Sequence, residues 1–544
     1  MPGQVSGTTI AGENPIKYGP AGYKGLLKEI RIFGLACFAT IGGFLFGYDQ
    51  GIISGVLVMH SFKTHFPTLS SDAGLEGWVV SIMTLGAMVG AFINGPISDC
   101  VSRRWSILMA NIIFLIGSIL QAAAEYVAMF FVGRFVFGVG AGMLAMVCPL
   151  YLSELAPPNI RGSLVALQQL SITFGIMCSF WVNYGTQYIG GTGVGQSQAA
   201  WRLPLALQCL PSLILASGTF FLPYSPRWLI NQGREDEALT TLVKLRRVPQ
   251  ADHRLQAEFL EIKAARMFDQ QTKTEKYREN VSRFQVALRE YKQLFVVSHL
   301  RRRTMVACLL QILQQFTGIN AIIYYAPQFF EAIGLSGNSV NLLATGVVGI
   351  VMFLCTIPAV MYLDRWGRRK TLMYGATGMS IAQLIVATLY AVYQDSFSQH
   401  PSAGWTACVF VWVYIATFAF SIACVNWCMP SEMFPPAIRG KAVGVAIAFN
   451  YLSNFIVALI TPLMLESITF RHILFLLGLL ADSWGLDLLL HVPIEEMDKL
   501  FRGNEGEGDL QRIAGIRAQL GMDSASLKHD LLQEQSSEHV EISV

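Results

Sequence analysis

The chain has 544 residues, of which 53% are hydrophobic and 14% are charged, and its formal net charge is +3. A soluble domain carries about 25% charged residues, so this composition indicates a chain built for lipid. So small a net charge gives no argument for a nucleic acid partner, and we expect none. The ten cysteines lack CxxC or metal-ligand spacing, so we expect small buried side chains, no metal and no cofactor.

Twelve apolar runs follow a polar start of the chain. The first 32 residues lack the features of a cleavable signal peptide, so we expect a tail there. A helix needs about 20 apolar residues to cross the ~30 Å core of a bilayer, and each run meets that length. The expected spans are 33–55, 76–98, 105–124, 127–152, 164–189, 202–222, 304–333, 340–363, 371–393, 406–430, 440–464 and 471–491.

A long charged stretch separates the sixth span from the seventh. It is rich in helix-forming residues, and its Lys and Arg outnumber its Asp and Glu, so we expect short amphipathic helices on a soluble face. Every second short loop is also basic, and the positive-inside rule then places this stretch and both termini in the cytoplasm. We expect a multi-pass plasma membrane protein with a tail, a six-helix bundle, a linker, a second six-helix bundle and a tail, at 1–32, 33–222, 223–303, 304–491 and 492–544.

Two segments of the first half recur in the second. SELAPPNIRG at 153–162 resembles SEMFPPAIRG at 431–440, and SDCVSRRWSI at 98–107 resembles LDRWGRRKTL at 363–372. The shared order indicates a parallel duplication of a six-span bundle, with a substrate site expected at the midplane between the halves. The predicted fold is an all-α membrane protein of twelve transmembrane helices in two six-helix bundles.

The recurring loops place carboxylates near arginines at the cytoplasmic ends of spans. Exposed ion pairs contribute only about 0–1 kcal/mol each to stability. A ring of pairs that forms in one state and breaks in another still biases an equilibrium between two states. We therefore predict a cytoplasmic gate, with ordinary interfacial anchoring as the alternative. Its residues are Asp99, Arg103, Glu154, Arg161, Asp364, Arg368, Glu432 and Arg439.

The seventh span concentrates amide side chains. A pocket for a sugar needs groups that both donate and accept hydrogen bonds, and an aromatic ring to lie against the sugar ring. Gln314 and Gln315 lie three and four residues after Gln311, so the three side chains project toward one helix face. That face must point inward, because lipid offers amides no hydrogen-bond partners. The alternative for any single amide is an interhelical hydrogen bond worth ~0.6 kcal/mol. Further candidates are Gln168, Gln169, Asn320, Trp427, Asn450 and Asn454.

Asp49 is the only charge in the first apolar run, within GFLFGYDQG at 43–51. A carboxylate at such a depth costs roughly 2.5–3.5 kcal/mol, so a partner or a proton is expected. The rise of ~1.5 Å per residue places Arg134 of the fourth span at nearly the same depth, so the two can face each other. One interpretation is a fixed buried pair. The other is a carboxylate that takes up a proton when it leaves the arginine.

Seven stretches resemble the sugar porter family of the major facilitator superfamily. They are GFLFGYDQG, GRFVFGVGAG, YLSELAPPNIRG, LPYSPRWL, QQFTGINAIIYYAP, DRWGRRK and PSEMFPPAIRG. The residues at 223–229 and 314–327 are most similar to those of fungal monosaccharide transporters. The resemblance implies proton symport for members with an aspartate at the position of Asp49. It also implies sugar-contacting roles for Phe46, Gln169, Gln314, Gln315, Asn320, Tyr324, Trp427 and Asn450.

The sequence departs from the family pattern at several positions. Cys100 and Ser102 replace residues of the usual DRxGRR motif, and ACVNW at 423–427 replaces the usual Gly-Pro before the tryptophan. Met352 stands where many members have an asparagine, which removes one partner for a sugar hydroxyl. The last span lacks the PETKG that usually follows it. These departures leave the identity of the sugar open, including sugar acids, polyols and disaccharides.

The sequence therefore predicts a secondary active transporter that imports a monosaccharide, a hexose or a pentose, with a proton by alternating access. Asp49 is the expected proton carrier and Arg134 its modulator. The alternatives are a facilitative uniporter and a nontransporting sugar sensor. A membrane enzyme is not expected, because no nucleophile–base pair stands out. A monomer is expected, because each chain encloses its own site.

Overall fold

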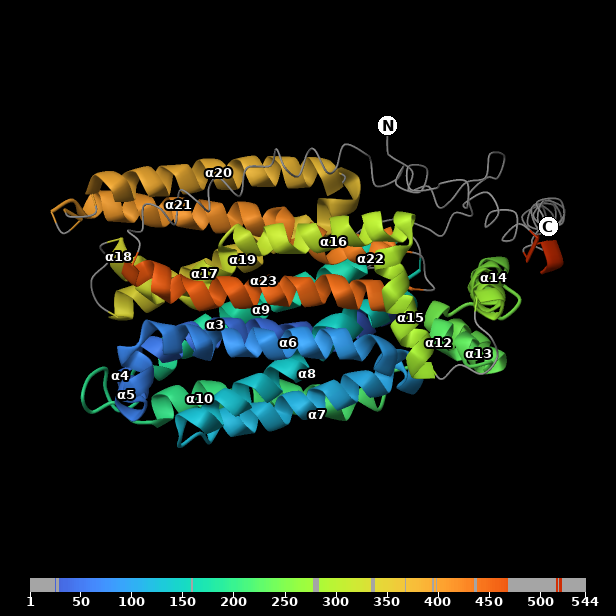
Figure 1. Ribbon diagram of the computed structural model, residues 1–544, viewed down its shortest axis with the longest axis horizontal. Coiled ribbons are helices and arrows are strands. Elements are labelled where there is room, and N and C mark those ends of the chain that lie inside the picture. The colour runs from blue at the N-terminus through green and yellow to red at the C-terminus, as the bar shows by residue number, and fades with distance from the viewer. Residues whose placement is uncertain are drawn as a thin grey trace, which may run out of the picture.

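The structure is a computed structural model. It describes residues 29–467, except 158–159, 277–282, 334–337, 367, 394–395, 398 and 435–437, together with residues 25, 515–516 and 518–520. All regular elements in these residues are helices, so the all-α prediction is confirmed there (Figure 1). The predicted twelfth span, 471–491, and nearly all of both predicted tails lie outside the described residues.

The first half of the chain forms long helices where the apolar runs predicted them. Short helices cover the loop after the first span, because its polar residues cannot continue through lipid. In chain order the elements are α2 (Ile30–Ala39), α3 (Ile41–Val58), α4 (His60–His65), α5 (Pro67–Ser71), α6 (Ala73–Val101), α7 (Arg103–Ala122), α8 (Val127–Leu155), α9 (Arg161–Thr186), α10 (Ala199–Leu207) and α11 (Cys209–Thr219).

The charged stretch between the halves is also helical and lies at one end of the molecule (Figure 1). Its elements are α12 (Pro226–Asn231), α13 (Glu235–Arg246), α14 (His253–Lys276) and α15 (Arg283–Val296). The second half then contains α16 (Ser298–Phe316), α17 (Ile319–Tyr324), α18 (Ala326–Ala332), α19 (Asn338–Trp366), α20 (Arg368–Tyr393), α21 (Pro401–Phe420), α22 (Ile422–Met433) and α23 (Arg439–Ser467).

Within the described residues, ten helices or consecutive helix pairs are long and apolar enough to cross a membrane, and each overlaps a predicted span. The predicted seventh span, 304–333, is instead broken into three helices. Gly318 has φ +85°, a left-handed conformation that glycine adopts without steric cost, and it ends α16. The Tyr414 hydroxyl donates to the Thr317 carbonyl at 2.8 Å, so the break leaves this backbone group satisfied.

Close helix contacts at glycines fix the first half around α3. A Cβ on Gly47 would lie 2.0 Å from the Ile172 carbonyl oxygen, and a Cβ on Gly175 would lie 2.3 Å from that of Phe44. The missing side chains let the backbones of α3 and α9 approach closely, as small residues do in membrane helix packing. The position of α3 is therefore set by its packing on α9.

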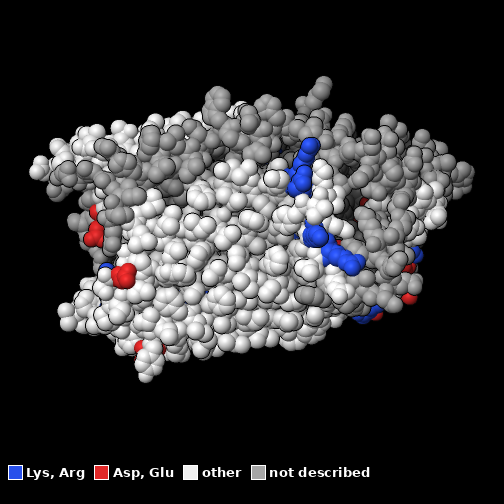
Figure 2. All heavy atoms as spheres, in the orientation of Figure 1, with Lys and Arg blue, Asp and Glu red and all other residues white. Residues whose placement is uncertain are grey.

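The two halves meet along two helix pairs, α6 with α23 and α9 with α19. Figure 1 shows α6 and α23 side by side along the centre of the molecule. Figure 2 shows a broad surface without charged side chains across the middle of this face. On this face Lys and Arg gather over α15 and the start of α16, and Asp and Glu appear at both ends of the molecule. An uncharged band between polar ends is the surface that a bilayer requires.

Candidate functional site

The amides of α16 form a hydrogen-bonded network with α17, α22 and α23. The Gln315 amide donates to Asn450 Oδ1 at 3.0 Å and accepts from Asn320 at 2.5 Å. The Asn450 amide donates to Gln311 at 2.7 Å and to Gln314 at 3.1 Å. All five side chains are buried. The network therefore brings together four of the predicted sugar-contacting residues, and Gln311, on one inward-facing surface.

The helix break at Gly318 explains why Asn320 joins this network. A continuous helix of 3.6 residues per turn would place Asn320 about 180° from Gln311 and about 140° from Gln315. Restarting the helix at Ile319 turns the Asn320 side chain back toward Gln315. The Thr-Gly pair at 317–318 therefore shapes the site, and the glycine was the sequence signal for it.

Asn426 belongs to the network although the sequence did not single it out as a site residue. Its amide donates to Gln314 Oε1 at 2.5 Å and to Gln311 Oε1 at 3.3 Å. Gln311 in turn donates to the Asn426 carbonyl at 2.9 Å. The departure of ACVNW from the family pattern was the available signal. Trp427, the next residue on α22, is partly buried and lies outside the network.

A second layer connects this surface to α3. The Tyr324 hydroxyl accepts from Gln50 at 3.4 Å and from Asn454 at 3.2 Å. The ring of Phe46 contacts Tyr451 edge to face, with centroids 5.5 Å apart. Phe46, Gln50 and Tyr324 are all buried. The predicted aromatic residues thus lie where the first half meets the second, and Gln50 is a contact that sequence reasoning missed.

Gln169 and its neighbour Gln168 lie on α9, outside the amide network. Both are buried. Among the described residues, the Gln168 amide has no hydrogen-bond partner at either its nitrogen or its oxygen. Gly43 of α3 lies directly against it, since a Cβ there would be 2.7 Å from the Gln168 nitrogen. Gln168 is therefore a buried polar group with unused hydrogen-bonding capacity.

Asp49 and Arg134 face each other, as their equal depth predicted. Arg134 Nη2 lies 3.4 Å from Asp49 Oδ2, and both side chains are 1% exposed. Arg134 also donates to Gln121 Oε1 at 3.3 Å and to the Val80 carbonyl at 3.5 Å. Among the described residues, Asp49 Oδ1 and Arg134 Nε have no hydrogen-bond partner.

The geometry of this pair matters because a buried ion pair offsets its desolvation only with good geometry and fully satisfied atoms. A single contact at 3.4 Å is longer than the 2.7–2.9 Å of a strong charge-assisted bond. The pair is therefore a weak structural link. Asp49 is adjacent to Gln50, which contacts Tyr324.

The predicted gate forms a charge cluster at the α15 end of α6. Arg103 contacts Asp99 and Glu154, each at 2.9 Å, and donates to the Ser98 carbonyl at 3.0 Å. Glu154, at the end of α8, is therefore bound by Arg103 at the start of α7. Among the described residues, the Arg161 Nε has no hydrogen-bond partner.

The corresponding residues of the second half are described only in part. Arg439 donates twice to the Phe434 carbonyl, each time at 3.2 Å, and Arg368 is partly buried at the start of α20. The side chains of Asp364 and Glu432 lie outside those that the structure describes.

Lys441 joins the two halves and the linker at this end, although it was not a predicted gate residue. Its ammonium group lies 3.6 Å from Asp99 of α6 and binds Glu290 of α15. At the other end of α6, Glu76 accepts from Gln328 of α18 at 2.7 Å. The two halves therefore contact each other on both sides of the amide network. Within the described residues, no group of three or more His, Cys, Asp or Glu is placed to hold a metal ion.

Two helical halves around a buried polar surface are the arrangement of many secondary transporters. The match to known proteins agrees. The family model described as sugar (and other) transporter matches residues 35–484. The chain belongs to this family, within the major facilitator superfamily.

Individual relatives cover most of the chain. A Neurospora crassa protein described as a probable glucose transporter is 37% identical over 78% of this chain and 69% of its own length. An Aspergillus niger protein described as a probable quinate permease is 33% identical over 93% of this chain and 94% of its own. The solved structure of XylE, a proton:xylose symporter bound to 6-bromo-6-deoxy-D-glucose, is 29% identical with a TM-score of 0.72. It covers 87% of this chain and 99% of XylE, which is a transporter from E. coli.

Proposed function

We propose that this sugar transporter imports a monosaccharide, a hexose or a pentose, together with a proton by alternating access. The observation that carries the proposal is the incompletely satisfied Asp49–Arg134 pair, one residue from Gln50, whose side chain contacts Tyr324 of the second half. A structural ion pair in the membrane needs satisfied atoms, whereas a proton carrier needs a partner that it can leave.

The amide network supports a neutral polyhydroxylated substrate. Its side chains bond mainly to each other, so a sugar hydroxyl that both donates and accepts can replace any of these bonds without leaving a buried group unpaired. Among the described residues of the network there is no Lys or Arg. This composition favours an uncharged sugar over a carboxylate such as quinate, which a relative is named for. The names of the probable glucose transporter and the proton:xylose symporter agree with a sugar.

Alternating access would open one end of the molecule at a time. Lys441 holds the halves at the α15 end, and the Gln328–Glu76 bond holds them at the other. With both contacts made, the amide surface is closed off from both ends of the molecule. An alternating-access cycle passes through such an occluded state between its two open states. We propose that the α15 end is cytoplasmic, since cations gather there, that both termini lie on that side, and that the chain acts as a monomer in the plasma membrane.

Uptake measurements test this function against a facilitative uniporter and a sensor. Labelled glucose, xylose, galactose, galacturonate and quinate are offered to cells that lack their own hexose carriers, with and without a protonophore. We expect wild type to concentrate one neutral monosaccharide, and the protonophore to abolish its accumulation. A uniporter would equilibrate the sugar regardless of the protonophore, and a sensor would not move it.

The Asp49→Asn variant tests the residue. It is expected to lose accumulation and to keep exchange of sugar across the membrane, because the amide surface remains. Glu125→Gln is the matched control, since Glu125 is an exposed carboxylate that pairs with Arg202 in the loop between α7 and α8. The control is expected to accumulate sugar as wild type does. Accumulation by Asp49→Asn at the wild-type level would show that the pair is only structural.

A further inference from the structure

Helix α15 presents large apolar side chains to its surroundings although it lies outside the predicted spans. Its buried face includes Tyr291 and Leu294. Its exposed face carries Leu288, Phe295 and Val296, which are 62%, 47% and 61% exposed. These three positions are i, i+7 and i+8, so they share one side of the helix. An amphipathic helix with such a stripe is suited to the interface of a bilayer.

Tyr291 attaches α15 to the membrane-spanning helix α6. Its hydroxyl donates to the Phe92 carbonyl at 2.9 Å, and its ring stacks on the Phe92 ring with centroids 4.8 Å apart and planes at 20°. Gly95 permits this contact, since a Cβ there would lie 2.9 Å from the Tyr291 hydroxyl. The apolar stripe of α15 is therefore held at the end of a transmembrane helix.

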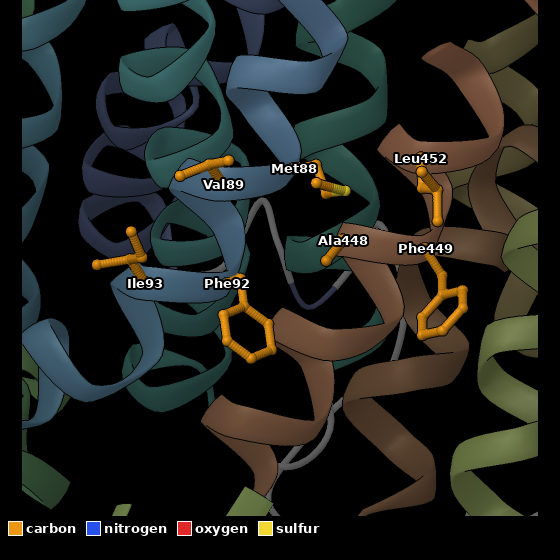
Figure 3. Close-up of a pocket in the computed structure, with 7 residues that line it drawn as sticks. All are labelled: Met88, Val89, Phe92, Ile93, Ala448, Phe449 and Leu452. Atoms are coloured by element: carbon orange, nitrogen blue, oxygen red, sulfur yellow. The ribbon is translucent and has the colours of Figure 1, made fainter. Parts of the chain in front are cut away.

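Phe92 also lines an apolar groove between the halves. The groove has a volume of about 310 Å³ and runs between α6 and α23 (Figure 3). Phe92 and Ile93 are about half exposed there, so the groove opens to whatever surrounds the spans. In a bilayer that surrounding is acyl chains. The lining residues are Met88, Val89, Phe92, Ile93, Ala448, Phe449 and Leu452.

Exposed cations stand at the α15 end of this groove. Lys292 follows Tyr291 and lies four residues from Leu288, on the apolar side of α15. Arg301 and Arg302 are exposed at the start of α16, which packs on α15. Figure 2 shows blue side chains over α15 and the start of α16 and none in the uncharged band beside them.

We propose that this surface binds an anionic glycerophospholipid of the cytoplasmic leaflet. One acyl chain fills the groove between α6 and α23, the phosphate and headgroup lie against Lys292 and the α16 arginines, and the apolar stripe of α15 enters the interface beside them. The charge of the exposed cations favours an anionic headgroup over a zwitterionic one. The site rests on the proposed orientation of the α15 end and on no property of the sugar or proton.

Native mass spectrometry of the full chain in detergent tests the lipid directly. Phosphatidylserine and phosphatidylcholine with identical acyl chains are added in equal amounts, and the retained lipids are counted. We expect phosphatidylserine to be retained preferentially. A cation at a membrane surface changes affinity about fivefold, so Lys292→Glu is expected to lower its retention by at least about that factor. Equal retention of the two lipids by wild type would overturn the proposal.

Two matched variants separate this site from general charge effects. Arg254→Glu makes a similar change at an exposed arginine of α14 and is expected to retain phosphatidylserine as wild type does. Ala448→Phe fills the groove and is expected to lower retention. Should that variant not fold, Lys292→Glu, on an exposed side chain, still decides the question. Competition by soluble glycerophosphoserine, which lacks acyl chains, would show a headgroup site alone and would also overturn the proposal.

Discussion

Replacing Asn426 by alanine tests the amide surface at the residue that sequence reasoning missed. The substitution removes one donor from Gln314, at 2.5 Å, and one from Gln311, at 3.3 Å, and leaves the rest of the network in place. Interhelical hydrogen bonds in membranes contribute ~0.6 kcal/mol on average and up to about 1.7 kcal/mol. If Asn426 holds these amides ready for the sugar, the KM should rise between about threefold and 20-fold.

The assay is the initial rate of uptake against concentration, for the sugar that wild type accumulates. We expect Asn426→Ala to raise KM with little change in the maximal rate, because the substitution disturbs binding and not the gates at either end. Surface expression of each variant is measured in parallel, so that a loss of protein is not read as a loss of affinity.

Asn111→Ala is the matched control. Asn111 donates to the Ser212 carbonyl at 2.8 Å and accepts from its hydroxyl at 2.9 Å, so this buried amide joins α7 to α11 away from the site. It should lower the melting temperature and leave KM unchanged. An unchanged KM in Asn426→Ala, or an equal rise in Asn111→Ala, would refute a binding role for the network.

Three further predictions concern packing and charge. Gly47→Ala brings a Cβ to 2.0 Å from a carbonyl of α9 and should abolish folded transporter at the membrane, whereas Gly185→Ala, with open space, should match wild type in fluorescence-detected size exclusion. Lys441→Ala removes the cation that binds Glu290 and lies 3.6 Å from Asp99, so it should lower the melting temperature of the transporter; an unchanged melting temperature would contradict this. The exposed Glu125 has a pKa lowered from 4.5 by its hydrogen bond to an arginine, so its stabilising effect should be lost as pH falls below 4.5, and a Glu125→Gln variant should melt with a shallower pH dependence there.

The positions of Asp49 and Arg134 show what the sequence could predict. Their equal depth followed from span limits and the helix rise, because a bilayer fixes depth and direction together. That the two side chains face each other is what the structure adds. The inward face of the α16 amides followed equally from the absence of partners in lipid. Such constraints act on single residues, so they needed no knowledge of the partner helix.

Contacts between distant segments were harder to predict. Gln50, Asn426 and Lys441 lie on helices whose relative rotation depends on packing. The hydrophobic periodicity of each helix does not predict that rotation. The pairing of Arg103 with Glu154 is of this kind, since it joins two helices across a sequence separation of 51 residues. The sequence indicated a helix break at Gly318. Predicting that Asn320 contacts Gln315 would also have required the direction of the helix that begins after the break.

In the proposed symport cycle, helix α3 is the element that would link the sugar site to the proton site. Phe46 and Gln50 are four residues apart and contact the second half, at Tyr451 and Tyr324. Asp49 points instead to α8 within the first half. A rigid rocking of the halves would leave Asp49 and Arg134 together, so coupling requires α3 to shift relative to α8.

The packing of α3 favours such a shift. Its glycine contacts bind it closely to α9, whereas its described polar link to α8 is a single contact at 3.4 Å. A sugar that draws Gln50 and Tyr324 toward itself would move α3 and α9 together and lengthen that weak contact further. The carboxylate would then lose its cation in a low dielectric, where the neutral acid is the cheaper state, and would take up a proton. In this scheme the order is sugar first and proton second at the level of α3. Disulfide-trapping α3 to α8 should block proton uptake and also weaken sugar binding, because the coupling between two sites is reciprocal.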